Sequence, residues 1–138
     1  MTEPIWTPLQ LKTDQISAKP LAIWTLVCDY VKGPLKLKVE ATGTWDYSPS
    51  KSCGPDGSRQ GGFPANALNP SAPLGALIGK IGGSTADKPL SSFVIGSYTV
   101  IALDDKAEGP LYFTMNDQIE HFDDHDKFIT IVVQQARG

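Results

Sequence analysis

The sequence lacks the features that mark several common classes of protein. No apolar run approaches the roughly 20 residues of a membrane-spanning helix, and the first residues carry no basic stretch of the secretory-signal kind. The 12 Lys and Arg residues are scattered, so no basic stripe follows a phosphate backbone. We therefore expect no membrane span and no nucleic-acid partner. The chain is expected to stay in the cytosol or to leave it without a Sec signal, unless a leader has been removed.

Cysteine is also scarce, because the chain has only Cys28 and Cys53. Two cysteines do not define the redox compartment. Cys28 lies in an apolar, strand-like run and is expected to be buried, whereas Cys53 lies in a predicted loop. The sequence leaves open whether the two form a disulfide bridge.

A sustained helical stripe of apolar residues is the third absence. The 13 Gly and 11 Pro fall between short apolar segments, several of which alternate polar and apolar residues with the period of a strand. The segment 21–30 is apolar on both faces, which predicts a central strand covered on both sides. Short strands separated by turn signals predict an all-β fold, specifically a jelly-roll β-sandwich. The strands are expected at residues 5–11, 21–30, 35–41, 75–81, 93–95, 98–103, 111–114 and 128–133.

The 138 residues are the size of one domain, and we expect a single domain over residues 1–138. Residues 47–72 are the exception to the strand pattern, with little capacity for regular structure. A loop of that length in a small domain is usually functional or disordered. We expect Phe63 and Leu68 to anchor it to the sandwich.

An acidic stretch at 115–128 is the most distinctive part of the chain. It carries five carboxylates within ten positions and both histidines of the protein: Asp117, Glu120, His121, Asp123, Asp124, His125 and Asp126. Such a loop between two strands is repulsive unless a positive charge lies in it. Ca²⁺ takes six to eight oxygen ligands from carboxylates and carbonyls, which makes it the favoured occupant. A solvated acidic turn is the plain alternative.

The spacing of His121 and His125 offers a second metal hypothesis. Residues four apart lie on one face of a helix, where two imidazoles beside Asp117 or Asp124 would suit zinc or nickel. A loop between strands need not be helical, however, and the oxygen-rich surroundings favour Ca²⁺.

Three blocks of sequence together resemble a known family. They are G-T-W-D-Y at 43–47 leading to G-P-D-G at 54–57, then L-G-A-L-I-G-K-I-G at 74–82, then N-D at 116–117 with the acidic loop that follows. Their order and spacing, over about residues 35–133, resemble the PA-IL-like family of calcium-dependent, galactose-binding bacterial lectins.

The resemblance implies a jelly-roll β-sandwich with one Ca²⁺ between two loops. The implied ligands are two backbone carbonyls and three carboxylates, from Tyr47, Asp117, His121, Asp123 and Asp124. The acidic loop is one residue shorter than in the galactose-binding lectin, so Asp124 with His125 is a second register for the last pair.

In these lectins sugar hydroxyls complete the coordination of the ion, and the resemblance therefore implies a carbohydrate as the partner. The implied contacts are Tyr47, Asp117, Gln118, His121, Asp123, Gln60 and Asn66. Galactosides are the expected class, although residues 61–68 contain neither the His nor the Gln with which galactose-specific members grip the sugar. Single sites of this kind are weak, so a homo-oligomer would gain through multivalency.

Catalysis is not expected. The sequence has no nucleophile elbow, phosphate-binding loop or H-E-x-x-H motif. The alternative to a lectin is a β-sandwich that Ca²⁺ only stabilises, by binding the native state, and that serves in interaction or assembly without binding sugar.

Overall fold

The computed structural model describes residues 4–82 and 92–137, which form an antiparallel β-structure with one short 3₁₀ helix. The elements are β1 (Thr7–Pro8), β2 (Gln15–Ser17), β3 (Thr25–Lys32), β4 (Leu35–Thr42), β5 (Trp45–Ser48), β6 (Lys51–Cys53), β7 (Leu77–Ile81), β8 (Phe93–Val94), β9 (Tyr98–Leu103), β10 (Glu108–Met115), η1 (Ile119–Asp124) and β11 (Asp126–Arg137). Over these residues no helix is long and apolar enough to cross a membrane.

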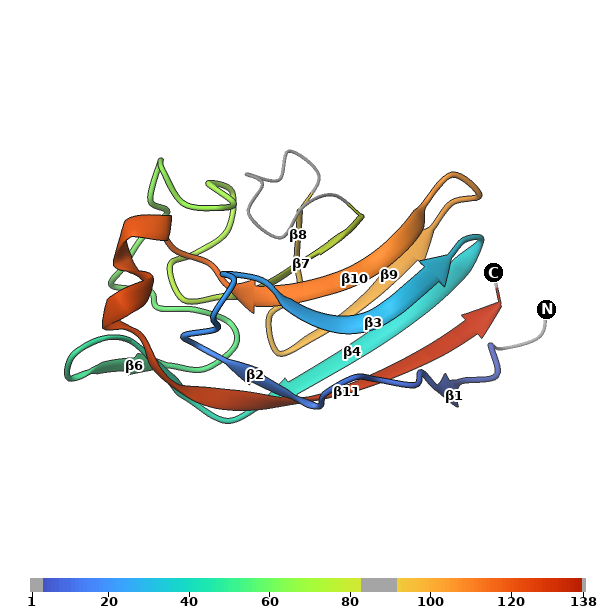
Figure 1. Ribbon diagram of the computed structural model, residues 1–138, viewed down its shortest axis with the longest axis horizontal. Coiled ribbons are helices and arrows are strands. Elements are labelled where there is room, and N and C mark those ends of the chain that lie inside the picture. The colour runs from blue at the N-terminus through green and yellow to red at the C-terminus, as the bar shows by residue number, and fades with distance from the viewer. Residues whose placement is uncertain (1–3, 83–91, 138) are drawn as a thin grey trace.

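The strands form two sheets that pack face to face (Figure 1). The larger has the order β6-β5-β11-β4-β9, with β1 and β2 also paired to β11, and the smaller has the order β3-β10-β7-β8. Figure 1 shows η1 at one end of the sandwich and β1 at the other. The predicted all-β sandwich is confirmed.

Period-two alternation explains why the two longest neighbours, β4 and β11, face the core as they do. In β4 the buried residues are Leu35, Leu37, Val39 and Ala41, while the residues between them face outward. The pairing of Ile131 with Ala41 places the buried residues of β11 beside them. Each large apolar side chain buried in this way stabilises the fold by about 1.5–3 kcal/mol.

The segment 21–30 is not the central strand that its sequence predicts. It becomes a strand only from Thr25, and β3 is the edge of the smaller sheet, with Asp29 and Tyr30 exposed. Trp24 instead packs in a second apolar cluster, against Leu68 and other residues of the loops. Within this run Trp24 covers the loop cluster and Val27 and Cys28 face the main core, while Leu21 is exposed.

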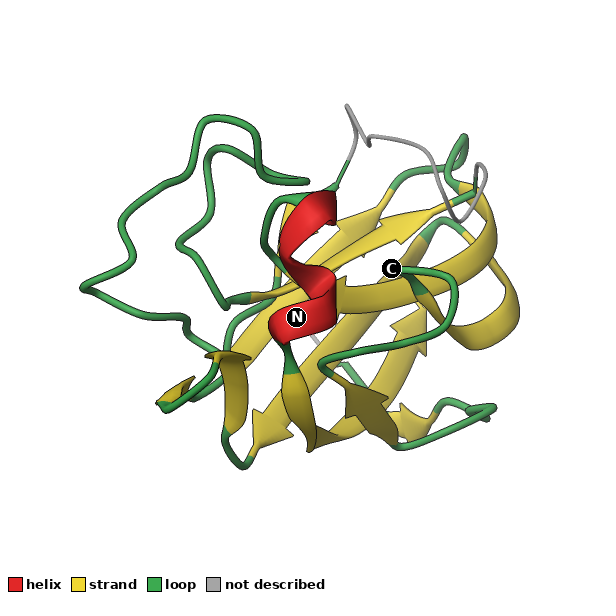
Figure 2. Cartoon of the chain, turned by 60° about the vertical axis from the view of Figure 1, so that its left-hand side comes forward, coloured by secondary structure: helices red, strands yellow, loops and turns green. Residues whose placement is uncertain are grey.

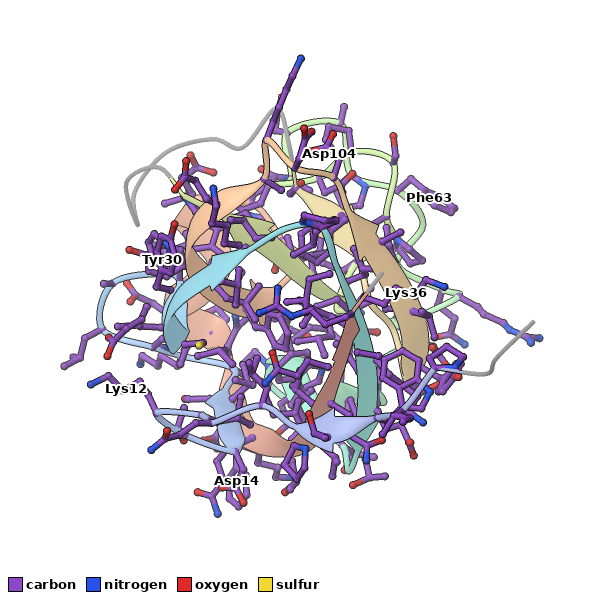
Figure 3. All side chains as sticks on the ribbon, turned by 90° about the vertical axis from the view of Figure 1, so that its right-hand side faces the viewer. Lys12, Asp14, Tyr30, Lys36, Phe63 and Asp104 are labelled. Carbon is purple, nitrogen blue, oxygen red and sulfur yellow. The ribbon has the colours of Figure 1, made fainter. Side chains whose placement is uncertain are left out.

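The edge of β3 is only partly covered. The backbone N–H of Lys12 donates to the Val27 carbonyl at 2.7 Å, and the Lys12 ammonium lies 3.2 Å from the Asp29 carboxylate. A groove of about 530 Å³ separates the rest of this N-terminal segment from β3, with Tyr30 and Gln135 in its lining. Figure 3 shows Lys12 and Tyr30 on this side of the molecule.

Three short strands and η1 were not expected from the sequence. Strands β2, β5 and β6 are only three or four residues long, which is too short for a sustained alternation to mark them. Pairing holds them: β2 and β5 pair with β11, and β6 pairs with β5. Helix η1 falls inside the acidic stretch that was expected to be a loop.

The two cysteines are both free thiols. Cys28 is buried, as expected, and Cys53 is partly buried beside the Gly75 carbonyl, 3.7 Å from its Sγ. Burial raises the pKa of the Cys53 thiol to about 11.

The raised pKa predicts slow reaction of Cys53 with alkylating reagents. The thiolate is the nucleophile, and at about pH 8 almost no Cys53 thiolate is present in the folded protein. Alkylation by iodoacetamide, followed by mass spectrometry, should be slow there and should accelerate as the pH approaches 11. Unfolding in urea should restore the rate of an ordinary thiol; equal rates in folded and unfolded protein would contradict the burial.

Packing at the centre of the sandwich gives a second prediction. Phe113 on β10 is fully buried in the main core, so Phe113→Ala should lower the free energy of unfolding by about 3–5 kcal/mol through cavity formation. Val132 is 55% exposed on the outer face of β11, and Val132→Ala should change it by less than about 0.5 kcal/mol. Urea denaturation of both variants measures the difference, and similar losses would argue against this core.

Candidate functional site

The end of the sandwich that carries η1 is held together by Asn116, the first residue after β10. Its side chain is fully buried. The amide oxygen accepts a hydrogen bond from the Asn69 N–H at 2.9 Å. The amide nitrogen donates to the carbonyls of Asn69 and Ala72, each at 2.9 Å, and of Pro73 at 3.2 Å. The long middle loop is thus fixed to the end of β10 by one side chain.

Asp117 is the second buried polar residue at this place, and its side chain is only 3% exposed. One carboxylate oxygen, Oδ2, lies 2.8 Å from Nε2 of His125. The other, Oδ1, accepts the N–H of Gln118 at 2.6 Å. The backbone carbonyl of Asp117 accepts the N–H of Leu68 at 3.0 Å, which ties the middle loop to this residue as well.

Both histidines approach Asp117, but in different environments. His125 has a side chain with 0% exposure, and its Nδ1 lies 2.8 Å from the Ala18 carbonyl. The Phe122 ring packs on it with centroids 4.4 Å apart. His121 lies on η1 with a side chain that is 52% exposed, and its Nδ1 is 3.5 Å from Oδ1 of Asp117.

Tyr47 lies on β5, the strand that packs against η1. The pairing of β5 with β6 shifts register between Asp46 and Ser48, so Tyr47 stands at an irregularity of the sheet edge. Its ring is buried, and its hydroxyl is 3.0 Å from Oγ of Ser58 in the middle loop. Tyr47 therefore joins the second loop to the same end of the sandwich.

The remaining predicted contacts are on the surface. Gln60 and Asn66 are exposed in the middle loop, Gln118 is partly buried, and Asp123 and Asp124 are exposed on η1. Figure 2 shows η1 in red beside the long loops of this end. The structure thus brings the middle loop, β5 and η1 together, with buried groups beneath and polar side chains above.

The three predicted carboxylate ligands of calcium lie in different surroundings. Ca²⁺ requires six or more oxygens at 2.3–2.6 Å. The Asp117 carboxylate is engaged with His125 and Gln118 instead, while Asp123 and Asp124 face solvent. Within residues 4–82 and 92–137, no group of three or more His, Cys, Asp or Glu side chains is placed to hold a metal ion, which applies equally to zinc or nickel. Calcium binding stays a prediction.

Sequence patterns missed three residues that matter here. Asn116 belongs to the N-D motif, but the sequence pattern assigned no role to it. In the structure its buried amide holds the middle loop. The burial of His125 was not foreseen, because the sequence pattern marked this residue only as a possible metal ligand. Phe63 was expected to anchor the middle loop, but its ring is 63% exposed and points outward in Figure 3, so that expectation is wrong. Leu68, the other expected anchor, is buried.

Comparisons with known proteins find the same fold in a solved structure. No protein-family model matches the sequence, and no curated protein sequence matches it. A solved structure described as "EclA N-terminal domain; PllA-like lectin" matches over 98% of this chain and 98% of its own, with a TM-score of 0.60 and 16% sequence identity. The chain shares the fold of a lectin domain. At this identity, the likeness concerns the fold.

The buried amide of Asn116 generates a prediction about the middle loop. Asn116→Ala removes the partner of the Asn69 N–H and of the Ala72 carbonyl, while the Asn69 and Pro73 carbonyls keep the N–H of Ala72 and of Ala76. Each unsatisfied buried group costs about 1–3 kcal/mol. We expect a loss of roughly 3 kcal/mol or more in urea denaturation, with faster proteolysis between residues 58 and 72. Asn66→Ala, at an exposed position of the same loop, is the control and should leave both unchanged.

Proposed function

We propose that the protein is a non-catalytic carbohydrate-binding β-sandwich, and that it binds sugar at the end that carries η1. The observation that carries the proposal is the construction of this end. Polar side chains stand at the surface, at Gln60, Asn66, Gln118, His121 and Asp123. The backbone beneath them is fixed by Asn116 and Asp117. Sugar hydroxyls both donate and accept hydrogen bonds, so amide, imidazole and carboxylate groups on a rigid frame suit them.

The exposed ring of Phe63 adds the apolar component that sugar recognition needs. Monosaccharides have an apolar face, and aromatic rings pack on it. Phe63 lies in the middle loop between Gln60 and Asn66, so one loop presents an exposed ring flanked by two amides. The proposal is also supported by the family resemblance of the sequence and by the fold shared with a domain described as a lectin.

The sugar class and the ion are finer points of the proposal. Galactosides are the first class to test, because the resemblance implies them. Calcium dependence is tested separately from sugar binding. The alternative, an interaction module without sugar binding, shares the fold but predicts no retention on any sugar.

The first experiment is binding of the labelled protein to an array of immobilised glycans, in parallel with EDTA and with millimolar CaCl₂. Reproducible binding to one glycan class supports the proposal, and the two arms report whether the ion is needed. Absence of binding to every glycan in both arms would reject it in favour of the interaction module.

A variant series then locates the site with the glycan found. Phe63→Ala should weaken binding roughly tenfold, because a stacked aromatic contributes up to about 1.5 kcal/mol. Tyr98 is an equally exposed aromatic residue on β9, and Tyr98→Ala should have no effect. Tyr30→Ala tests the groove beside β3. Loss of binding in the Tyr30 or Tyr98 variant, with Phe63→Ala unaffected, would place the site elsewhere.

A further inference from the structure

The imidazole of His125 lies between two oxygens that belong to distant parts of the chain. Oδ2 of Asp117, just after β10, is 2.8 Å from Nε2, and the carbonyl of Ala18, just after β2, is 2.8 Å from Nδ1. The side chains of His125 and Asp117 are 0% and 3% exposed. The ring therefore joins three segments of the chain in a water-excluded place: the start of the β2–β3 connection, the end of β10 and the end of η1.

The chemistry of the three groups defines how they join. A carbonyl only accepts hydrogen bonds, so Nδ1 of His125 donates to Ala18. At the same time Nε2 lies at hydrogen-bonding distance, 2.8 Å, from the Asp117 carboxylate oxygen. One rigid, planar side chain thus contacts both oxygens.

This arrangement engages the carboxylate that a calcium site would need, with one hydrogen bond on each oxygen. Asp117 is the one buried member among the three predicted carboxylate ligands, because Asp123 and Asp124 are exposed. Both of its oxygens already have partners, His125 and the N–H of Gln118. The Phe122 ring packs against the imidazole and closes the site on that side.

We propose that His125 takes the place of a loop-bound Ca²⁺ in this protein. Its imidazole cross-links the Asp117 carboxylate to the Ala18 carbonyl, as a metal ion joins oxygen ligands from separate loops, and the end of the sandwich is stable without metal. The proposal concerns how the loops are held, and it does not depend on sugar binding.

Thermal melts of the wild-type protein test the proposal directly. A ligand that binds the native state raises the melting temperature by mass action, so a protein with a calcium-held loop melts later in CaCl₂ than in EDTA. We expect the two curves of the wild-type chain to coincide within about 1 °C. A calcium-induced rise of several degrees would overturn the proposal, whatever the behaviour of the variants.

Two variants test the cross-link itself. His125→Ala leaves the Asp117 carboxylate buried without its partner, which should lower the melting temperature by about 10 °C. His121→Ala, the matched control on the exposed histidine, should shift it by no more than about 2 °C. Equal effects of the two variants would overturn the proposal.

A double variant separates a cross-link from two independent structural roles. If Asp117 and His125 act as one unit, the melting temperature of Asp117→Ala with His125→Ala should lie near that of the worse single variant, because the second change removes an interaction already lost. Losses that simply add would overturn the proposal. If His125→Ala is not recovered in folded form, the wild-type comparison of EDTA with CaCl₂ still decides.

Discussion

Buried polar groups need hydrogen-bond partners, and this requirement shapes the end of the sandwich that carries η1. Where β10 ends, Asn116 and Asp117 enter the interior as two consecutive polar side chains. Asn116 meets the requirement by holding the middle loop, and Asp117 meets it through His125 and the backbone after it. The long loop and η1 are therefore placed by the end of one strand, and the surface above them takes its form from two side chains that solvent does not reach.

The alternating strands were predictable because the buried and the exposed residues of each strand are neighbours in sequence. Lysines between leucines in β4 show which face is buried, whatever the neighbouring strands are. The edge position of β3 was not predictable, since the same apolar residues cover either a second sheet or a loop cluster, and only the position of Trp24 distinguishes the two. Short polar strands such as β2 arise from pairing with β11, a long-range effect that no window of sequence contains.

The same holds for the candidate site: features within one stretch of sequence were predictable, and contacts between distant stretches were not. Carboxylate density singled out residues 115–128, and the structure places η1, which lies within them, against β5. The sequence did not show which histidine is buried, because His121 and His125 have similar acidic neighbours. Burial of His125 depends on the Ala18 carbonyl, more than a hundred residues away in sequence. Exposure of Phe63 is similarly a property of how the loop is anchored at Asn69 and Leu68.

The partly covered edge of β3 has a consequence for how the molecules behave in concentrated solution. An eight-residue edge strand offers unpaired backbone groups to any other chain that exposes a strand. Here the segment before β2 bonds to the edge at Val27, and the charges of Asp29 and Lys32 stand along the remainder. Desolvating these charges would be costly for an incoming strand. The N-terminal segment thus covers part of the edge at which a strand of another copy would otherwise add.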